Sequence, residues 1–448
     1  MKCESIRQRP MRMFFGTFIA VLLSVHFSGA ASAAVRTVTN LYDTGSGSLR
    51  NVLTDAIPGD SIVFDAGLNG TILMTHGVLA ITKDISIDGG NRITLSGENL
   101  NRIFTVTNAS LSLNNLSLMN GNPPDVDEEF QADIGGALYF DATSGSRTLT
   151  LTNCRVTGNK GDRDMSGAIF ASMAELADSL TVNLTDCVLN NNATGGLYVE
   201  ARNADQGQVA VNIADCKFMA NAGSGIVTFV EELASTVTIM NSLIDGNGVP
   251  GGPVRGVRTA ARDSAQVTFL MDGCTVSNNT GGWGAAGLQV ETTNNASIIT
   301  VRKSRFIGNV TTADYDAEGA VHLYNDSTGS MRVENCFFAS NRSDGGMAGA
   351  LLLETTSGTI RMTNNTVFGN TAGSHGGGVV IHLRGNDAAV NFYNNIIYGN
   401  TLTEGTLGKD IYIDDDYYIY PAVGDGIGAG ALLSHNIFGP GTQASTLR

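Results

Sequence analysis

One short pattern recurs nine times between residues 150 and 400, at spacings of 26 to 33 residues. Each copy has a small residue, an apolar residue two positions later, and an asparagine three positions after that. The copies begin at Cys154, Cys187, Cys216, Ser242, Cys274, Ser304, Cys336, Asn365 and Asn395. A period of this length indicates one supersecondary unit per repeat, stacked on its neighbours to bury a shared core. The pattern therefore predicts a solenoid.

The residues before each small residue alternate between apolar and polar. Leu149 and Leu151, for example, stand five and three positions before Cys154. This period of two predicts a half-buried first strand. The phase then slips by one residue, which requires a bend, and the residue at the slip is Asn, Asp or Gly in eight of nine copies, with Lys303 as the exception. Those three residue types tolerate a left-handed backbone at least cost.

The asparagine that closes each copy marks a second turn, and stacked asparagines can hydrogen-bond along a column. A third strand follows a variable connection and begins with small residues, as in Gly195-Gly196-Leu197. Coils of about thirty residues are too long for left-handed hexapeptide helices. The sequence therefore predicts an all-β fold, a right-handed single-stranded parallel β-helix of about twelve coils.

A solenoid exposes core and strand edges at its ends, so the ends need caps. Residues 48–56 predict a short amphipathic helix with Leu49, Val52 and Leu53 on one face, stopped by Pro58 and Gly59. We therefore expect an N-terminal cap over residues 34–70 and the β-helix over residues 71–448. The C-terminus ends on another near-repeat, residues 434–438, without an evident cap, which predicts an anchoring partner there or a truncated chain.

Residues 1–33 have the pattern of a signal peptide. Four basic residues precede an apolar stretch over residues 14–27, and Ala31-Ser32-Ala33 offers a small-residue cleavage site. The apolar stretch is short for a membrane span. We therefore expect a secreted or cell-surface protein, in the outer membrane context of a bacterium, whose mature chain does not insert into the membrane.

The charge of the mature chain limits the classes of partner that it can bind. The whole sequence carries 27 basic and 42 acidic residues, and residues 1–33 account for four basic and one acidic residue, which leaves 23 against 41, or −18. This field disfavours nucleic acid and anionic lipid as partners. It is compatible with an extracellular location or with Ca²⁺ binding.

Five cysteines remain after the predicted cleavage, and all occupy the first position of the repeated pattern, where Ser or Asn stands in the other copies. An odd number in an exported protein can indicate a disulfide framework with a spare thiol. Their shared position favours a column of small buried side chains instead.

Two motifs carry a family resemblance. Gly135-Gly136-Ala137-Leu138 is one, and the Phe-x-x-Asn segments at Phe218, Phe306 and Phe338 are the other. With these motifs the chain resembles bacterial β-helix surface proteins similar to the polymorphic outer membrane protein repeat family, without that family's C-terminal autotransporter barrel. The opening over residues 37–64 also looks like the N-terminal cap of such exported proteins. The resemblance implies adhesive or structural work at a cell surface.

The outward positions of the third strands combine rings, acids, imidazoles and arginine, which a glycan-binding surface requires. The pattern also assigns Leu138 and Phe140 to this outward face. The ligand-binding residues that we predict are Tyr198, Glu200, Phe229, Arg258, Gln289, Glu291, His322, Tyr324, Glu354 and His382.

Catalysis is a weaker possibility on the same face. Glu291 and Glu354 are two coils apart, or about 10 Å along the axis, with His322 between them. A glycosidase needs two carboxylates about 5–10 Å apart. No metal site is expected, although the alternating acids Asp314, Asp316 and Glu318 offer ligands for Ca²⁺; solvated loop acids are the commoner interpretation.

Fold alone does not give function, because β-helices serve as lyases, hydrolases and adhesins. No tight acid–base cluster recurs, which favours binding over catalysis. The sequence thus predicts an adhesin or glycan-binding rod that engages an extracellular glycan or a host or matrix surface without a cofactor. The alternatives are a polysaccharide lyase or glycosidase using Glu291, His322 and Glu354, and a structural envelope protein.

Overall fold

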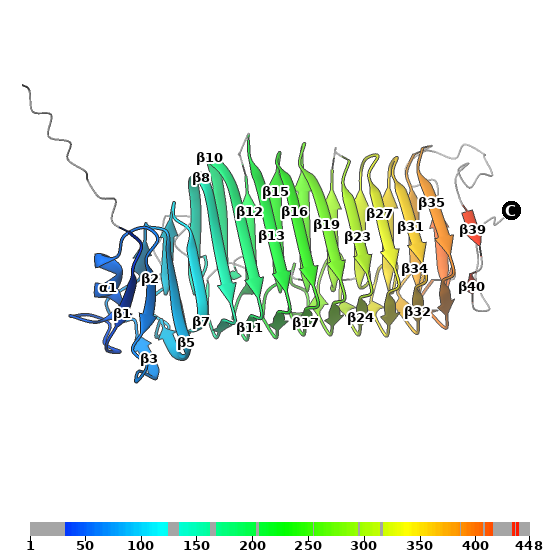
Figure 1. The fold of residues 1–448 in the computed structure, drawn as a ribbon. Coiled ribbons are helices and arrows are strands. Elements are labelled where there is room, and N and C mark those ends of the chain that lie inside the picture. Colours follow the sequence, from blue (N-terminus) through cyan, green and yellow to red (C-terminus); the bar gives the residue numbers. More distant parts are fainter. Residues whose placement is uncertain are drawn as a thin grey trace, which may run out of the picture. The chain divides into compact units, whose positions relative to one another are not determined.

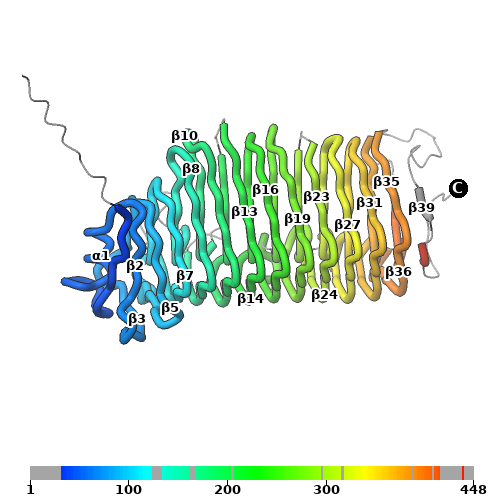
Figure 2. Tube along the Cα trace, in the orientation of Figure 1, coloured from blue at the N-terminus to red at the C-terminus, as the bar shows by residue number. Residues whose placement is uncertain are grey.

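The computed structural model describes residues 32–123, 134–161, 167–202, 206–253, 255–293, 296–313, 317–385, 387–405, 408–414, 432–434 and 436–438. The predicted signal peptide lies almost wholly outside these residues. From Ala33 onward the chain forms one compact unit. In the described part, every strand pairs in parallel with its counterpart in a neighbouring repeat, and the coils follow one another in sequence order (Figures 1 and 2). The predicted all-β solenoid of about twelve coils is confirmed.

Each coil contains three main strands. The first strands begin with β1 (Val35–Val38) and β2 (Ser61–Phe64), then run within the longer strands β5 (Ile85–Ser96), β7 (Leu111–Met119), β8 (Leu138–Thr152) and β10 (Gly167–Thr185). They continue as β13 (Gln208–Ala214), β16 (Ala234–Met240), β19 (Gln266–Asp272), β23 (Ile298–Arg302), β27 (Ser330–Glu334), β31 (Thr359–Thr363), β35 (Ala389–Tyr393) and β39 (Leu432–Ser434).

The second strands are short and follow the first bend. They are β3 (Gly70–Leu73), β9 (Arg155–Thr157), β11 (Val188–Asn190), β14 (Lys217–Met219), β17 (Leu243–Asp245), β20 (Thr275–Ser277), β24 (Arg305–Ile307), β28 (Phe337–Ala339), β32 (Thr366–Phe368), β36 (Ile396–Tyr398) and β40 (Ile437–Phe438), while β5 and β7 supply this position in their own coils.

The third strands include the start of β8 and of β10. The others are β4 (Leu79–Ile81), β6 (Phe104–Thr107), β12 (Gly195–Ala201), β15 (Ile226–Glu231), β18 (Val257–Arg262), β22 (Leu288–Thr292), β26 (Val321–Asn325), β30 (Leu351–Thr355), β34 (Val379–Leu383) and β38 (Ile411–Asp414). A separate small sheet lies in the connections that lead to the third strands. It consists of β21 (Thr280–Gly281), β25 (Val310–Thr311), β29 (Arg342–Ser343), β33 (Thr371–Ala372) and β37 (Thr401–Leu402).

The inward side chains of all three strand sets form one continuous core. Leu149 and Leu151 are fully buried, as the alternation in the sequence predicts. Identical residues stack from coil to coil, and the rings of Phe306 and Phe338 are 5.0 Å apart and nearly parallel. Stacking of this kind follows from the parallel register, which repeats each inward position at the strand spacing of about 4.8 Å.

Both predicted turns have left-handed backbone conformations. All nine residues at the phase slip have positive φ, and this includes Lys303 at 51°. At the second turn, the residue that precedes each closing asparagine is the left-handed one, for example Gly158 at 66° and Ala220 at 51°. The bends are therefore set by the backbone geometry that the sequence pattern indicates.

The cysteines form the predicted column. The backbone N–H of Cys187 donates to the Sγ atom of Cys216 at 3.3 Å, and the N–H of Cys216 donates to the hydroxyl of Ser242 at 3.1 Å. All five described cysteines are buried free thiols. The interpretation as stacked small side chains is confirmed.

The closing asparagines form a second buried column. From Asn159 to Asn370, each side-chain amide donates to the Oδ1 atom of the next asparagine at 2.8–3.1 Å. The column ends at Asp410, whose Oδ1 atom accepts the amide of Asn400 at 2.9 Å. Each asparagine of the column thereby forms hydrogen bonds with buried backbone groups that the turn would otherwise leave without partners.

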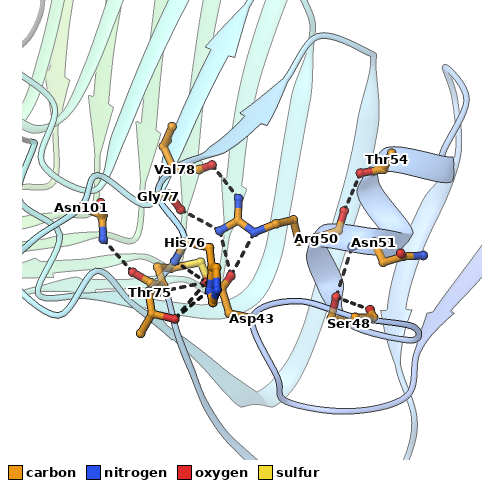
Figure 3. Close-up of polar contacts among 12 residues, drawn as sticks. Asp43, Ser48, Arg50, Asn51, Thr54, Thr75, His76, Gly77, Val78 and Asn101 are labelled. Atoms are coloured by element: carbon orange, nitrogen blue, oxygen red, sulfur yellow. Dashed lines mark hydrogen bonds and ion pairs between the residues drawn. The ribbon is translucent and has the colours of Figure 1, made fainter.

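The predicted capping helix is α1 (Leu49–Asp55), the only helix among the described residues. Ser48 caps its first turn by accepting the N–H of Asn51, and Leu49 and Leu53 join the core. Figure 3 shows how this segment is tied to the first coils: Arg50 pairs with Asp43 at 2.8 Å, and Asp43 accepts the backbone N–H of His76 at 2.7 Å. The predicted boundary at residue 70 stays a prediction. Within the described residues, no helix has the length and apolar character of a membrane span.

Candidate functional site

The predicted ligand-binding residues lie in two adjacent columns on the outward face of the third strands. The parallel register places Arg258, Gln289 and His322 in successive coils of the first column. Glu291, Tyr324, Glu354 and His382 follow one another in the second column. The parallel pairing therefore brings together side chains that are about thirty residues apart in sequence. Whether they bind a ligand stays a prediction.

The assignment of Leu138 and Phe140 to this face is wrong. Leu138 pairs with Ile169, and both Leu138 and Phe140 are fully buried in the core. The outward residues of this coil are Tyr139 and Asp141. An alignment of Gly136-Ala137 with Gly167-Ala168 gives the correct register, so the signal was present in the sequence.

The aromatic part of the first column is closed to solvent. The rings of Tyr139 and Phe170 are 5.8 Å apart, and those of Phe170 and Tyr198 are 5.1 Å apart, both pairs nearly parallel. With Ile134 and Val227 they form a small buried cluster of their own. Because Tyr198 is only 3% exposed, its ring supports this cluster and has no free face for a sugar.

Phe229 is held between two arginines. The guanidinium of Arg202 lies 4.4 Å from the ring centroid, and that of Arg262 lies 5.2 Å from it. Arg202 also pairs with Glu200 at 3.3 Å, and burial raises the pKa of Glu200 against the effect of this arginine. The two arginines occupy a third outward position, two residues beyond the second column, which the sequence argument did not include.

Glu291 belongs to a polar group around Arg258. The Nη2 atom of Arg258 donates to Oε2 of Glu291 at 3.2 Å, and the amide of Gln289 donates to Oε1. Burial would raise the pKa of Glu291, but the charge of Arg258 keeps it below its ordinary value. Arg255, from the preceding connection, is 6% exposed and donates to the carbonyl of Trp283 at 3.0 Å; burial lowers its pKa to about 10.

Glu354 is the centre of a second polar group. Its Oε2 atom lies 2.9 Å from Nε2 of His322. Its Oε1 atom lies 2.7 Å from Nδ1 of His382 and accepts Nη2 of Arg384 at 2.8 Å. On the other side of His322, Nδ1 lies 2.5 Å from Oε2 of Glu318. Both oxygens of Glu354 are therefore engaged by basic groups.

These contacts fix the charge states of the pair. Burial alone would lower the pKa of His322, but the charge of Glu318 and the contacts with both glutamates raise it to about 10. Burial would likewise raise the pKa of Glu354, yet hydrogen bonds with His322 and His382 hold it well below its ordinary value. His322 is therefore a cation and Glu354 an anion at neutral pH.

The predicted catalytic trio does not form one cluster with free groups. His322 contacts Glu354, while Glu291 pairs with Arg258 and Gln289. A glycosidase needs one carboxyl group with a raised pKa to protonate the leaving group. The pKa values of Glu291 and Glu354 are both lowered, so neither has the raised pKa of such a group, and a catalytic role for the trio stays a prediction.

The predicted Ca²⁺ ligands lie only partly within the described residues. Asp314 and Asp316 lie outside the described residues, and Glu318 forms an ion pair with His322. Within the described ranges, no group of three or more His, Cys, Asp or Glu side chains is arranged to hold a metal ion.

Comparison with known proteins identifies the fold. A family model described as a right handed beta helix region matches residues 71–268. The fold is a right-handed parallel β-helix. The predicted hand is thereby confirmed. No curated protein matches the chain.

Among solved structures, this β-helix is similar to the crystal structure of PfbA, a surface adhesin of Streptococcus pneumoniae. The TM-score is 0.48 and the sequence identity is 11%, with 91% of this chain and 100% of that chain covered. A likeness at this distance concerns the general fold. The finer resemblance to polymorphic outer membrane proteins stays a prediction.

Proposed function

We propose that this β-helix is an extracellular adhesin that binds glycans on a host, matrix or cell surface. The extracellular location rests on the signal-peptide pattern of residues 1–33 and on the acidic charge of the mature chain. The binding role rests on the outward face of the third strands.

The observation that carries the proposal is the way charged and aromatic groups are held on this face. Phe229 is fixed between Arg202 and Arg262, and Glu291 is fixed by Arg258 and Gln289. Side chains that are already ordered lose little entropy when a ligand binds. The arginines and Glu291 offer directed hydrogen bonds, whereas an acid–base catalyst needs a group free to exchange its proton.

The accessible part of the face is its outer edge, which we call the third-strand rim. The rim comprises the charged residues that stand two positions beyond the second column, namely Arg202, Glu231, Arg262, Asp326 and Arg384. Their charges alternate in sign, and the uncharged Thr293 and Thr356 occupy the coils on either side of Asp326. The three arginines are exposed and the two acids are half-buried. We propose that the glycan contacts this rim, because the first column lies beneath the connections.

An enzymatic role has less support. The carboxylates of Glu291 and Glu354 are both held ionised by basic neighbours, so neither is suited to act as a general acid. A purely structural envelope role would leave the mixed charges of the rim without a ligand. Both alternatives give distinct results in one experiment.

The test incubates the mature protein with a panel of polysaccharides and measures bound ligand together with new reducing or unsaturated ends. We expect binding without new ends, and we expect Arg262→Ser to weaken the binding. Arg332→Ser is the matched control, because Arg332 is an exposed arginine on the first-strand face. New ends that disappear in Glu291→Gln would establish catalysis instead. Absence of binding to every glycan and matrix component would leave the structural role.

A further inference from the structure

A second surface with a different chemistry lies on the outward face of the first strands. Its central row runs through five successive coils and consists of Ser112, Thr150, Asn183, Asn212 and Thr238. The outward residues two positions before and two positions after each of these form one further row on each side, so the surface has three parallel rows. We call this surface the hydroxyl face, and it comprises the outward residues of segments 110–114, 148–152, 181–185, 210–214 and 236–240.

The hydroxyl face carries no charge. None of its five segments contains an acidic or basic residue, although the whole chain has a net charge of −15. The same sheet becomes charged further along, where Arg302 pairs with Asp272 at 2.7 Å and Arg332 lies beside Arg361. The charge-free surface is therefore a property of these coils and not of the sheet. A partner that matches it by charge is neutral.

The polar groups of the hydroxyl face are ordered before any ligand binds. The amide of Asn212 donates to Oδ1 of Asn183 at 2.9 Å, and the backbone N–H of Thr148 donates to the hydroxyl of Ser110 at 3.1 Å. Threonine is stiff at χ1 because it is β-branched. The parallel register repeats these groups every 4.8 Å or so along the coils. Hydrogen bonds from such an array have a small entropic cost.

A groove lies at the N-terminal end of this face. It has a volume of about 320 Å³, and its lining includes the hydroxyl-bearing residues Ser86, Ser110, Ser112, Thr148 and Thr150. Ile85 and Leu111 give it an apolar part. One acidic residue, Asp84, also lines it, and its Oδ1 atom accepts the backbone N–H of Ser110 at 2.7 Å. Its volume is in the range of small-molecule sites, from about 300 Å³ upward. Hydroxyls beside methyl groups suit a sugar ring, which presents hydroxyls at its edge and C–H bonds on its faces.

We infer that the hydroxyl face binds a neutral polysaccharide that lies along the coils, with a sugar unit in the groove. The ligand class rests on the proposed glycan-binding function, whereas the surface and the neutral charge do not. A protein partner fits less well, since protein interfaces depend on Trp, Tyr and Arg anchors and these five segments contain none. Binding through uncharged groups is also insensitive to salt.

The experiment measures retention of the mature protein on neutral polysaccharides, namely cellulose, chitin and a soluble neutral glucan, with polygalacturonate as the anionic comparison. The double variant Thr150→Lys/Thr238→Lys places two charges on the hydroxyl face. We expect it to bind neutral polysaccharide at least about tenfold more weakly than the unaltered protein. Wild-type retention should be unchanged between about 0.05 and about 0.5 M salt, because no ion pair contributes.

Two further variants separate lost binding from lost folding. Thr150→Val/Thr238→Val keeps the β-branched shape and removes only the hydroxyls, so it should fold normally and still bind more weakly. Thr275→Lys adds the same kind of charge on the second strands and should bind as the unaltered protein does. Thermal unfolding of each variant verifies that the β-helix is intact.

Unchanged binding of neutral polysaccharide by both double variants would overturn the inference. So would failure of the unaltered protein to bind any neutral polysaccharide. If charged glycans are then still bound and are lost in Arg262→Ser, the proposed function survives without this second surface. Loss of neutral binding in Arg262→Ser, with both hydroxyl-face variants unaffected, would assign the neutral ligand to the third-strand rim.

Discussion

His322 and Glu354 form an ion pair between neighbouring coils, with Nε2 of the imidazole 2.9 Å from Oε2 of the carboxylate. Their side chains are only 6% and 7% exposed. Charges at this depth are stable only when they are paired, because each has lost its hydration. Breaking this pair should therefore lower the free energy of unfolding more than breaking an exposed ion pair does.

Removing the carboxylate of Glu354 should leave the buried His322 cation with Glu318 as its one remaining acidic partner in the described contacts. We expect Glu354→Gln to lower the free energy of unfolding by about 3 kcal/mol, the scale of breaking a buried pair. Glu334→Gln is the matched control, because Glu334 pairs with the half-exposed Arg361 at 3.7 Å and should cost less than about 1 kcal/mol. Urea unfolding followed by circular dichroism measures both. Equal losses of unfolding free energy in the two variants would show that the buried contacts of Glu354 stabilise the fold no more than an exposed ion pair does.

The same pair predicts how stability depends on pH. The pKa of His322 is raised from 6.5 to about 10, so its contribution is complete below pH 6.5 and is lost progressively as the pH rises toward 10. The pKa of Glu354 is lowered from 4.5, so its contribution is present above pH 4.5 and is lost as the pH falls. Stability should therefore be greatest between about pH 4.5 and 6.5.

Thermal unfolding across pH 4 to 10 tests this dependence. His322→Gln cannot change its charge, so the decline in melting temperature above pH 6.5 should be shallower in this variant than in the unaltered protein. His76→Gln serves as the control, because His76 lies on the surface near Asp43 and is well exposed. Parallel alkaline slopes in all three proteins would exclude His322 as the titrating group.

The backbone path was predictable because every repeat carries the same sequence signals for its strand and its bend. Nine copies place an alternating strand before the bend and a left-handed residue at it, so local geometry and core pattern agree. Lys303 illustrates the strength of this agreement, since its backbone adopts φ of 51° although its residue type disfavours that region. Position in the coil overrides the preference of one residue.

The contents of the candidate site were only partly predictable. Alternation along the third strands identifies Glu354 and His382 as outward residues, but it does not say what lies above them. Glu318 and Arg255 enter from connections of variable length, and the sequence pattern contains no register for these segments. Outward residues such as Tyr198 are therefore buried where the pattern indicates exposure.

Lys303 also provides a stabilising substitution. A residue with a β-carbon is disfavoured in the left-handed region by about 1–2 kcal/mol, whereas asparagine visits it at lower cost. We expect Lys303→Asn to raise the free energy of unfolding by about 1 kcal/mol. Lys217→Asn is the control, because Lys217 is an exposed residue of β14 without positive φ, and it should give no gain. A loss of stability in Lys303→Asn would mean that the Lys303 side chain stabilises its surroundings.

The buried asparagine column gives the last prediction. The Oδ1 atom of Asn279 accepts the backbone N–H and the side-chain amide of Asn247, both at 3.0 Å. Its own amide donates to the carbonyl of Ile244 at 3.0 Å and to Oδ1 of Asn309 at 2.9 Å. Truncation to alanine leaves these buried groups without partners, and each such group costs about 1–3 kcal/mol.

We therefore expect Asn279→Ala to lower the free energy of unfolding by about 3–5 kcal/mol, and amide hydrogen exchange to increase first in the coils on either side of it. Asn212→Ala is the matched control, because the exposed Asn212 makes a single side-chain hydrogen bond to Asn183; its cost should be below about 1 kcal/mol. Each coil contacts only its neighbours. Loss of one asparagine from the column should therefore destabilise the adjacent coils before it destabilises the whole β-helix. Uniform exchange along the whole β-helix in Asn279→Ala would show that the coils unfold as one unit and that the column does not stabilise them pair by pair.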